Sequence, residues 1–375
     1  MARPDVARQL GWQLGVKVSL DSVRYPRPGV VRCEGLALVN PETGRRVLFC
    51  QGIETRSTRR QSGPLLVITP LDPPQIEADQ MDELGRLVER LVARRGGWPQ
   101  LDVQLKVPEV TLVTESGRLG LAGVEGRLRT LAAAEVLDGT DPGASGTVAQ
   151  LALSFPGTTS GGPAKVSLRR VRPGPRAKGQ SPPVTELSLD TGAAPLPCPL
   201  LAAFWPEASR LGPRARFRGT IAATAGRGPW SAQVQGTLQD VDLQRLVADH
   251  IEPHRLTGTA DSIELTRLRL SGGVAQEVEA TIDARKGTIS RGLVEAAARH
   301  LRLTSGLVPS DPAEIPFDRL TALVTLDARG LSLRALPESN QGAILSDRGG
   351  AILKADHSGP VHPIALAEIL PNTRR

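Results

Sequence analysis

Strict alternation between apolar and polar side chains constrains the fold of this 375-residue chain more than any other feature. In segment 101–107 every odd position is Leu or Val, and in 278–284 every even position is Val, Ala or Ile. Segment 320–328 repeats the pattern with Leu, Ala and Val. Because successive side chains of a strand point to opposite faces, these segments predict strands with one packed and one solvated face, as in antiparallel sheets.

Turn signals separate the strand-like segments. Pro26-Arg27-Pro28-Gly29 and the Asn-Pro-Glu-Thr-Gly of 40–44 each lie between alternating segments, and they predict two hairpins early in the chain. Glycines at 117, 120, 123 and 126 recur at period three within strand-like sequence, unlike the spacing of a dinucleotide-binding loop. Overall we expect roughly twenty short strands and about six helices, and so a mainly β fold.

One strong helix is predicted over Asp79–Arg95. Apolar residues recur there at helical spacing from Met81 to Val92, and Gly96-Gly97 would end the helix. The spacing at Val6–Leu14 predicts a shorter opening helix. Shorter helices are also expected within three segments that lie between strands: 199–205, 243–248 and 292–301.

Composition divides the chain into three regions. Segments 136–147 and 156–183 are rich in Gly, Pro, Ser and Thr. We therefore expect an N-terminal helix and β region over 1–135, β segments within linkers over 136–183, and a C-terminal β-repeat region over 184–375. Segments 236–250 and 287–300 each begin with Gly-Thr and end with His after a strand, turn and short helix. Divergent repeats and coincidence both explain this similarity.

The charge balance does not single out a partner. The formal net charge is +7, but the basic residues are scattered through every segment, which favours solvated faces over an anionic membrane surface or nucleic acid. Aromatic residues make up only 3% of the chain, so few rings are available to stack on bases. Nucleic-acid binding is therefore the disfavoured interpretation.

The sequence shows no recognisable catalytic, cofactor-binding or metal-binding motif. It has neither a Gly-x-Ser-x-Gly elbow nor a Gly-Lys-Ser/Thr phosphate loop. Pro253 lies between His250 and His254, which interrupts the helix that a shared metal ion would require. His357 and His362 lack a placed nucleophile. We therefore predict a protein that is not an enzyme, with an undetected hydrolase as an alternative.

Three cysteines are too few and too irregularly spaced for a disulfide framework or a zinc site. Cys33 and Cys50 flank the 40–44 turn almost symmetrically, so antiparallel pairing is expected to bring them within one residue of register. Two interpretations remain open, a disulfide in an oxidising compartment and two small buried residues.

Two regions carry a family resemblance. The first comprises Leu-Gly-Trp-Gln-Leu-Gly-Val-Lys-Val at 10–18 and Gly-Leu-Ala-Leu-Val-Asn-Pro-Glu-Thr-Gly at 35–44. The second comprises short strand and turn motifs at 236–238, 241–243, 256–260, 287–290, 330–331, 342–345 and 350–353. In this order they resemble AsmA-like proteins of the bacterial envelope, a family related in outline to TamB and chorein-type lipid-transfer proteins.

The resemblance implies an elongated, curved antiparallel β-sheet with an apolar groove, acting in lipid transport or outer-membrane assembly. It also implies phospholipid or another lipid as ligand, inner-membrane or envelope proteins as partners, and a periplasmic place at the inner membrane. The family's N-terminal membrane helix is missing here, since no segment approaches the roughly 20 apolar residues of a span. We expect the natural protein to reach a membrane through residues not in this chain or through a partner.

The candidate groove follows from the balance of strands and helices. Roughly twenty one-sided strands present more apolar face than about six helices cover, so the sheet is expected to curl and leave a trough. The candidate lining residues are Val278, Ile282, Leu320, Val324 and Leu326. The alternative is a structural or protein-interaction scaffold in which these side chains pack a closed core.

Overall fold

The computed structural model describes most of the chain. The described residues are 7–8, 11, 16–60, 63–93, 102–115, 117–131, 145–153, 164–172, 183–203, 205–226, 228–251, 254–306, 313–337 and 342–355. The expected opening helix at Val6–Leu14 lies largely outside these residues.

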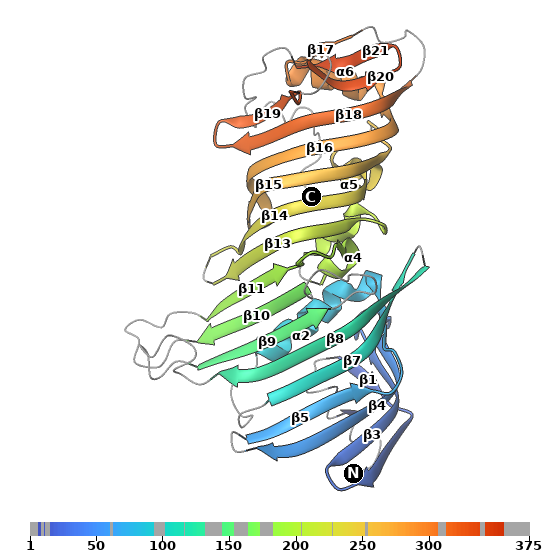
Figure 1. Ribbon diagram of the computed structural model, residues 1–375, viewed down its shortest axis with the longest axis vertical. Coiled ribbons are helices and arrows are strands. Elements are labelled where there is room, and N and C mark those ends of the chain that lie inside the picture. The colour runs from blue at the N-terminus through green and yellow to red at the C-terminus, as the bar shows by residue number, and fades with distance from the viewer. Residues whose placement is uncertain are drawn as a thin grey trace, which may run out of the picture. The chain divides into compact units, whose positions relative to one another are not determined.

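The protein is mainly β, with few and mostly short helices, as the alternation predicts (Figure 1). The strand ladders are antiparallel, apart from the parallel pairings of β5 and β6 with β7. The chain divides into two compact units. The first contains Met1–Pro206 and Ile221–Trp230, and the second contains Glu207–Thr220 and Ser231–Arg375.

The elements up to Leu211 are β1 (Lys17–Ser19), β2 (Ser22–Arg27), β3 (Val30–Val39), β4 (Arg46–Arg60), β5 (Gly63–Pro70), β6 (Gln75–Glu77), η1 (Ala78–Gln80), α2 (Met81–Ala93), β7 (Asp102–Thr114), β8 (Gly117–Leu131), β9 (Ser145–Leu153), β10 (Ala164–Arg172), β11 (Val184–Asp190), β12 (Leu196–Pro197), α4 (Cys198–Leu201) and η2 (Pro206–Leu211). The later elements are β13 (Arg216–Ala225), β14 (Ser231–Asp242), α5 (Leu243–Ile251), β15 (Thr259–Ser271), β16 (Val274–Ser290), α6 (Arg291–His300), β17 (Thr304–Ser305), β18 (Glu314–Asp327), β19 (Gly330–Arg334), β20 (Ala343–Asp347) and β21 (Gly350–Lys354).

The two predicted N-terminal hairpins are confirmed. β2 and β3 meet at the pair Arg27–Val30, around the Pro28-Gly29 turn. β3 and β4 are joined by the 40–44 turn, where the Asn40 side-chain oxygen accepts hydrogen bonds from the backbone N–H groups of Glu42 and Thr43. An asparagine that bonds its own loop in this way favours a turn over continuation of the strand.

The long helix is confirmed as η1 followed by α2, which packs on the sheet of the first unit. Leu87 contacts the cluster that contains Val16 and Leu38, while Met81 packs with Leu112 and Ala202. A Cβ atom at Gly85 would overlap the carbonyl oxygen of Ala203. Glycine at this position therefore permits the close approach of α2 to the α4 segment. The expected stop at Gly96-Gly97 lies outside the described residues.

The strands of the Gly- and Pro-rich middle region continue the ladder of the first unit. β9 pairs with β8 and β10, and β10 also pairs with β11. These ladders tie the middle strands to the N-terminal sheet, and the first compact unit extends to Pro206, beyond the expected start of the C-terminal region at 184.

The second unit is built on the antiparallel ladder β14–β15–β16–β18. One edge of β18 is shared by β19 and β20, and β21 pairs with both β20 and β17. Two of the three short helices predicted between strands are confirmed as α5 and α6, which begin directly where β14 and β16 end, and the one expected at 199–205 is the shorter α4 of the first unit.

The two Gly-Thr segments occupy corresponding places in this ladder. The backbone N–H of Leu243, the first residue of α5, donates to the carbonyl of Gly258, which immediately precedes β15. The N–H of Arg291, the first residue of α6, donates to the carbonyl of Ala313, which immediately precedes β18. This correspondence favours a repeated strand–helix arrangement over a coincidence of sequence.

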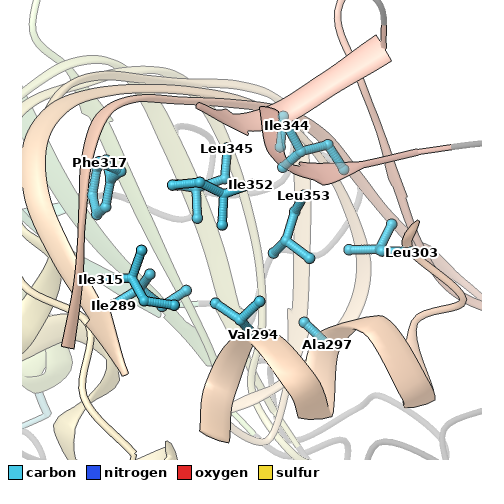
Figure 2. Packing of buried hydrophobic residues seen from close by; sticks show 11 residues of the cluster. Ile289, Val294, Ala297, Leu303, Ile315, Phe317, Ile344, Leu345, Ile352 and Leu353 are labelled. Carbon is cyan, nitrogen blue, oxygen red and sulfur yellow. The ribbon is translucent and has the colours of Figure 1, made fainter. Parts of the chain in front are cut away.

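A hydrophobic cluster fills the space between α6 and the strands around it (Figure 2). Val294 and Ala297 point from α6 toward side chains of the β20–β21 hairpin. The buried members are Ile289, Val294, Ala297, Leu303, Ile315, Phe317, Ala322, Ile344, Leu345, Ile352 and Leu353. We call this group the α6 cluster.

Candidate apolar binding face

The five candidate groove residues lie on one face of the second unit's sheet. Val278 is directly opposite Leu326, and the pairs Ala280–Val324, Ile282–Ala322 and Ala284–Leu320 follow in register. Side chains of directly opposed residues project from the same face of an antiparallel pair, and every second residue of a strand does so as well. The structure therefore brings Val278, Ile282, Leu320, Val324 and Leu326 together.

These five residues divide into two groups according to what covers them. Leu320 and Val324 are partly buried and pack against the α6 cluster. Val278, Ile282 and Leu326 are also partly buried, but they do not belong to that cluster among the residues the structure describes. All five residues are thus partly buried, and two of them pack against the α6 cluster.

The same face continues onto β15, which the sequence reading did not assign to the groove. Leu268 lies opposite Val278, and Ile263 lies opposite Ile282. The register shifts between Leu265 and Arg267, so the spacing of the apolar residues changes within the strand. This bulge interrupts the strict alternation that would have marked the segment as a lining strand.

The strands of the second unit's ladder end differently on its two sides. At one end of the strands, β15 turns into β16 and β18 turns into β19, and we call this the turn end. At the opposite end, β14 and β16 continue into α5 and α6, and we call this the helix end. Figure 1 shows α5 and the β18–β19 turn on opposite sides of this ladder.

The apolar face contains both buried and partly exposed positions. Ala260 and Ala284 face each other near the helix end, and both are fully buried at 0% exposure. Toward the turn end, Ala232 and Val234 of β14 are also buried. Five apolar residues of this face are partly exposed: Leu268, Leu270, Val278, Leu326 and Leu331. We call these five residues the open strip.

The opposite face carries cross-strand ion pairs. Arg267 and Arg269 both contact the carboxylate of Glu277, at 2.6 and 3.3 Å, and Arg319 contacts Asp283 at 3.3 Å. The hydrogen bond that Arg267 donates to Glu277 raises the pKa of the Arg267 guanidinium, which stays charged. The arginine side chains are half-exposed, so each pair adds little to stability. Their position shows which face of the sheet is solvated, as the alternation predicts.

The predicted register of Cys33 and Cys50 is wrong. Cys33 pairs with Ile53, and Cys50 pairs with Leu36, so the two cysteines are three residues out of register. Three residues along a strand span roughly 10 Å, beyond the Cα separation of about 4.4–6.8 Å found in disulfides. Both thiols are free and buried. The β3–β4 turn is centred later in the chain than the spacing of the cysteines suggests.

Burial also governs the chemistry of the thiols. Desolvation raises the pKa of Cys33 and, as the largest effect, that of Cys50. It raises the pKa of Cys198, which begins α4, to about 12. A buried thiol that stays protonated at neutral pH is a poor nucleophile and a poor metal ligand.

The described residues contain no group of three or more His, Cys, Asp or Glu side chains able to hold a metal ion. α5 ends at Ile251, so His250 and His254 do not share one helix. His357 and His362 lie outside the described part of the chain. None of the helices within the described residues is long and apolar enough to cross a bilayer.

The apolar face can hold hydrocarbon but offers no group for covalent or acid–base chemistry. Its side chains on β15, β16 and β18 are Ala, Val, Ile and Leu, without a hydrogen-bonding group among the described positions.

Comparison with protein-family models, with curated proteins and with solved structures finds no match to this chain.

Proposed function

We propose that this chain is a non-enzymatic protein of the cell envelope whose apolar β face binds the acyl chains of a lipid. The role follows the AsmA-like resemblance, which implies lipid transport or outer-membrane assembly. One observation supports it most directly: Val278, Ile282 and Leu326 lie on a continuous apolar face and remain partly exposed.

The chemistry of this face suits an alkyl chain. Burying apolar surface contributes roughly 25 cal/mol per Å², and an alkyl chain brings no polar group that needs a partner. An amide or a charged group placed on the same face would lose its hydrogen bonds to water without replacement, which costs roughly 1–3 kcal/mol or more. The face therefore discriminates by polarity rather than by specific contacts.

The direct test is native mass spectrometry of the protein purified from bacteria without detergent. The proposal predicts lipid adducts, and solvent extraction should identify them as acyl-bearing molecules. Protein that is folded but free of lipid, and that does not take up fatty acid added afterwards, would contradict the proposal.

A second candidate function is a structural or protein-interaction scaffold without lipid binding. The packing of Leu320 and Val324 on the α6 cluster favours this alternative, because two of the five candidate residues contribute to a protein core. The scaffold predicts that the open strip is covered by another protein. Cross-linking in cells should then recover a protein partner through residues of the strip, whereas the lipid proposal predicts cross-links to lipid.

The envelope assignment has its own test. We propose that the protein sits at the inner membrane, on its periplasmic side, with lipid or envelope proteins as partners. Fractionation of cells that express the protein from its native locus should place it with membranes. Recovery entirely in the cytoplasmic fraction would contradict the envelope assignment without bearing on the apolar face.

A further inference from the structure

We infer that Arg170, near the end of β10, binds a phosphate group. This residue belongs to the first unit, whereas the acyl chains of the proposed function bind on the sheet of the second unit. The phosphate position is therefore independent of that function, and its test is separate.

Arg170 projects from the packed face of β10. Alternate residues of a strand share a face, and Val166 and Leu168, which alternate with Arg170, are only 7% and 8% exposed. Arg169 projects from the other face, where it forms an ion pair with Glu186. β10 thus places one guanidinium beside an acid and the next one on the face of the buried apolar side chains.

The guanidinium of Arg170 is held in place but incompletely bonded. Its Nη1 donates a hydrogen bond of 2.9 Å to the hydroxyl of Thr185, which lies directly opposite on β11. Its Nε is excluded from solvent and has no acceptor among the residues that the structure describes. The residue opposite Arg170 on β9 is Thr147, so no acid faces it in register on either side. Buried polar groups of native proteins nearly always have a hydrogen-bond partner, so this N–H is expected to meet an acceptor.

The unbonded edge of the guanidinium suits a group with two adjacent oxygens. Because Thr185 holds Nη1, the N–H groups of Nε and Nη2 remain as a pair of parallel donors. An arginine fork binds phosphate or carboxylate through such a pair. Arg170 is only partly buried, so its side chain is accessible from solvent.

The charge of the surrounding strands favours phosphate over carboxylate. β10 has four basic residues and no acid, β9 has no charged residue, and β11 has two acids. A phosphate monoester carries about −1.5 to −2 charges at neutral pH, more than a single carboxylate. The same group occurs as free phosphate and as the headgroup of phosphatidic acid.

Isothermal titration calorimetry in chloride buffer tests the position with two probes, inorganic phosphate and monomeric dihexanoyl phosphatidic acid. Arg170→Gln removes the guanidinium, and Arg170→Lys keeps the charge without the paired donors. Arg169→Gln is the matched control, because it removes the same charge from the opposite face of the same strand. Circular dichroism establishes that each variant is folded.

The wild type should bind at least one probe, and both Arg170 variants should bind it at least tenfold more weakly, whereas Arg169→Gln should bind it as the wild type does. Binding of inorganic phosphate would assign the free ion as sufficient, and binding of phosphatidic acid alone would assign a phospholipid headgroup. Equal weakening by Arg169→Gln and Arg170→Gln would overturn the site, because the ion would then follow net charge alone. Folded wild-type protein that binds neither probe, or binding that does not depend on Arg170, would overturn it as well. None of these results bears on the acyl-chain binding of the second unit.

Discussion

Val278 on β16 and Leu326 on β18 are directly opposite each other, and both side chains remain partly exposed on the apolar face of the sheet. Two pairs further along the same strands, Ala322 is buried within the α6 cluster. The same alternating pattern thus produces an open position and a packed one within a few residues. Ala322 packs with α6 and the β20–β21 hairpin, whereas Val278 and Leu326 do not belong to that cluster.

Charge substitutions should separate these two parts. We predict that Val324→Glu lowers the free energy of unfolding by about 1–3 kcal/mol, because Val324 packs against the α6 cluster and a carboxylate would lose solvation there. Val278→Glu should cost less, since Val278 does not belong to that cluster. Urea titration followed by circular dichroism measures both values.

Gln233 on β14 supplies the matched control, because it is exposed and lies opposite Arg269 on the face of the ion pairs, so Gln233→Glu adds the same charge outside the apolar face. Equal and large losses of stability in the Val278 and Val324 variants would mean that the whole face is core. That result would favour the scaffold over lipid binding.

The close approach of α2 and α4 predicts a glycine-specific effect in the first unit. Gly85→Ala should destabilise the protein by about 1–3 kcal/mol, because the new methyl group would overlap the Ala203 carbonyl and force the two segments apart. Gly228→Ala is the control, since no atom lies within 4 Å of a Cβ at that position. Thermal unfolding of the two variants compares them; equal stability would show that the helix shifts at no cost.

The three thiols should be unreactive in the folded protein. Iodoacetamide at neutral pH should modify none of them, whereas urea-denatured protein should gain three adducts by mass spectrometry. Cys198 should react last as the pH rises, because burial raises its pKa to about 12. A peptide containing a Cys33–Cys50 disulfide in unreduced protein would contradict the register of β3 and β4.

The same thiol links stability to pH with a definite sign. The ordinary thiol pKa of 9.0 applies in the unfolded chain, and the folded value of Cys198 is about 12. Between these values the unfolded state has lost the proton that the folded state retains, so stability falls as pH rises through this window. The urea midpoint should decrease above pH 9.0, and Cys198→Ala should show a smaller decrease.

Local patterns were sufficient to predict much of the fold. The turns at Pro28-Gly29 and Asn40, the amphipathic spacing of α2 and the short helices after β14 and β16 are all encoded by residues close in sequence. The strands β9 and β10 were harder to place, because the flanking Gly- and Pro-rich sequence suggested linkers. Their membership of the first unit depends on pairing with β8 and β11, which no local pattern reveals.

The candidate face was predicted only in part, because local patterns reveal apolar positions but not the distant residues that pack on them. Alternation identifies Val278, Ile282 and Val324 as apolar positions, and the ladder does bring them to one face. Sequence cannot distinguish the open from the packed positions, because their cover comes from residues at 294 and beyond. The bulge in β15 concealed the contribution of Leu268 to this face. The register of Cys33 and Cys50 was predicted wrongly because the position of the turn centre decides which residues pair, and the spacing of the cysteines does not fix that position.

The central claim is that the open strip binds acyl chains, and its most direct test is the affinity of a fluorescent fatty acid for the Val278→Glu variant. The variant should remain folded, and it should bind the fatty acid at least tenfold more weakly than wild type, since roughly 1.4 kcal/mol of lost binding free energy produces that ratio. Gln233→Glu should bind as wild type does. A folded Val278→Glu protein with unchanged affinity would contradict the account.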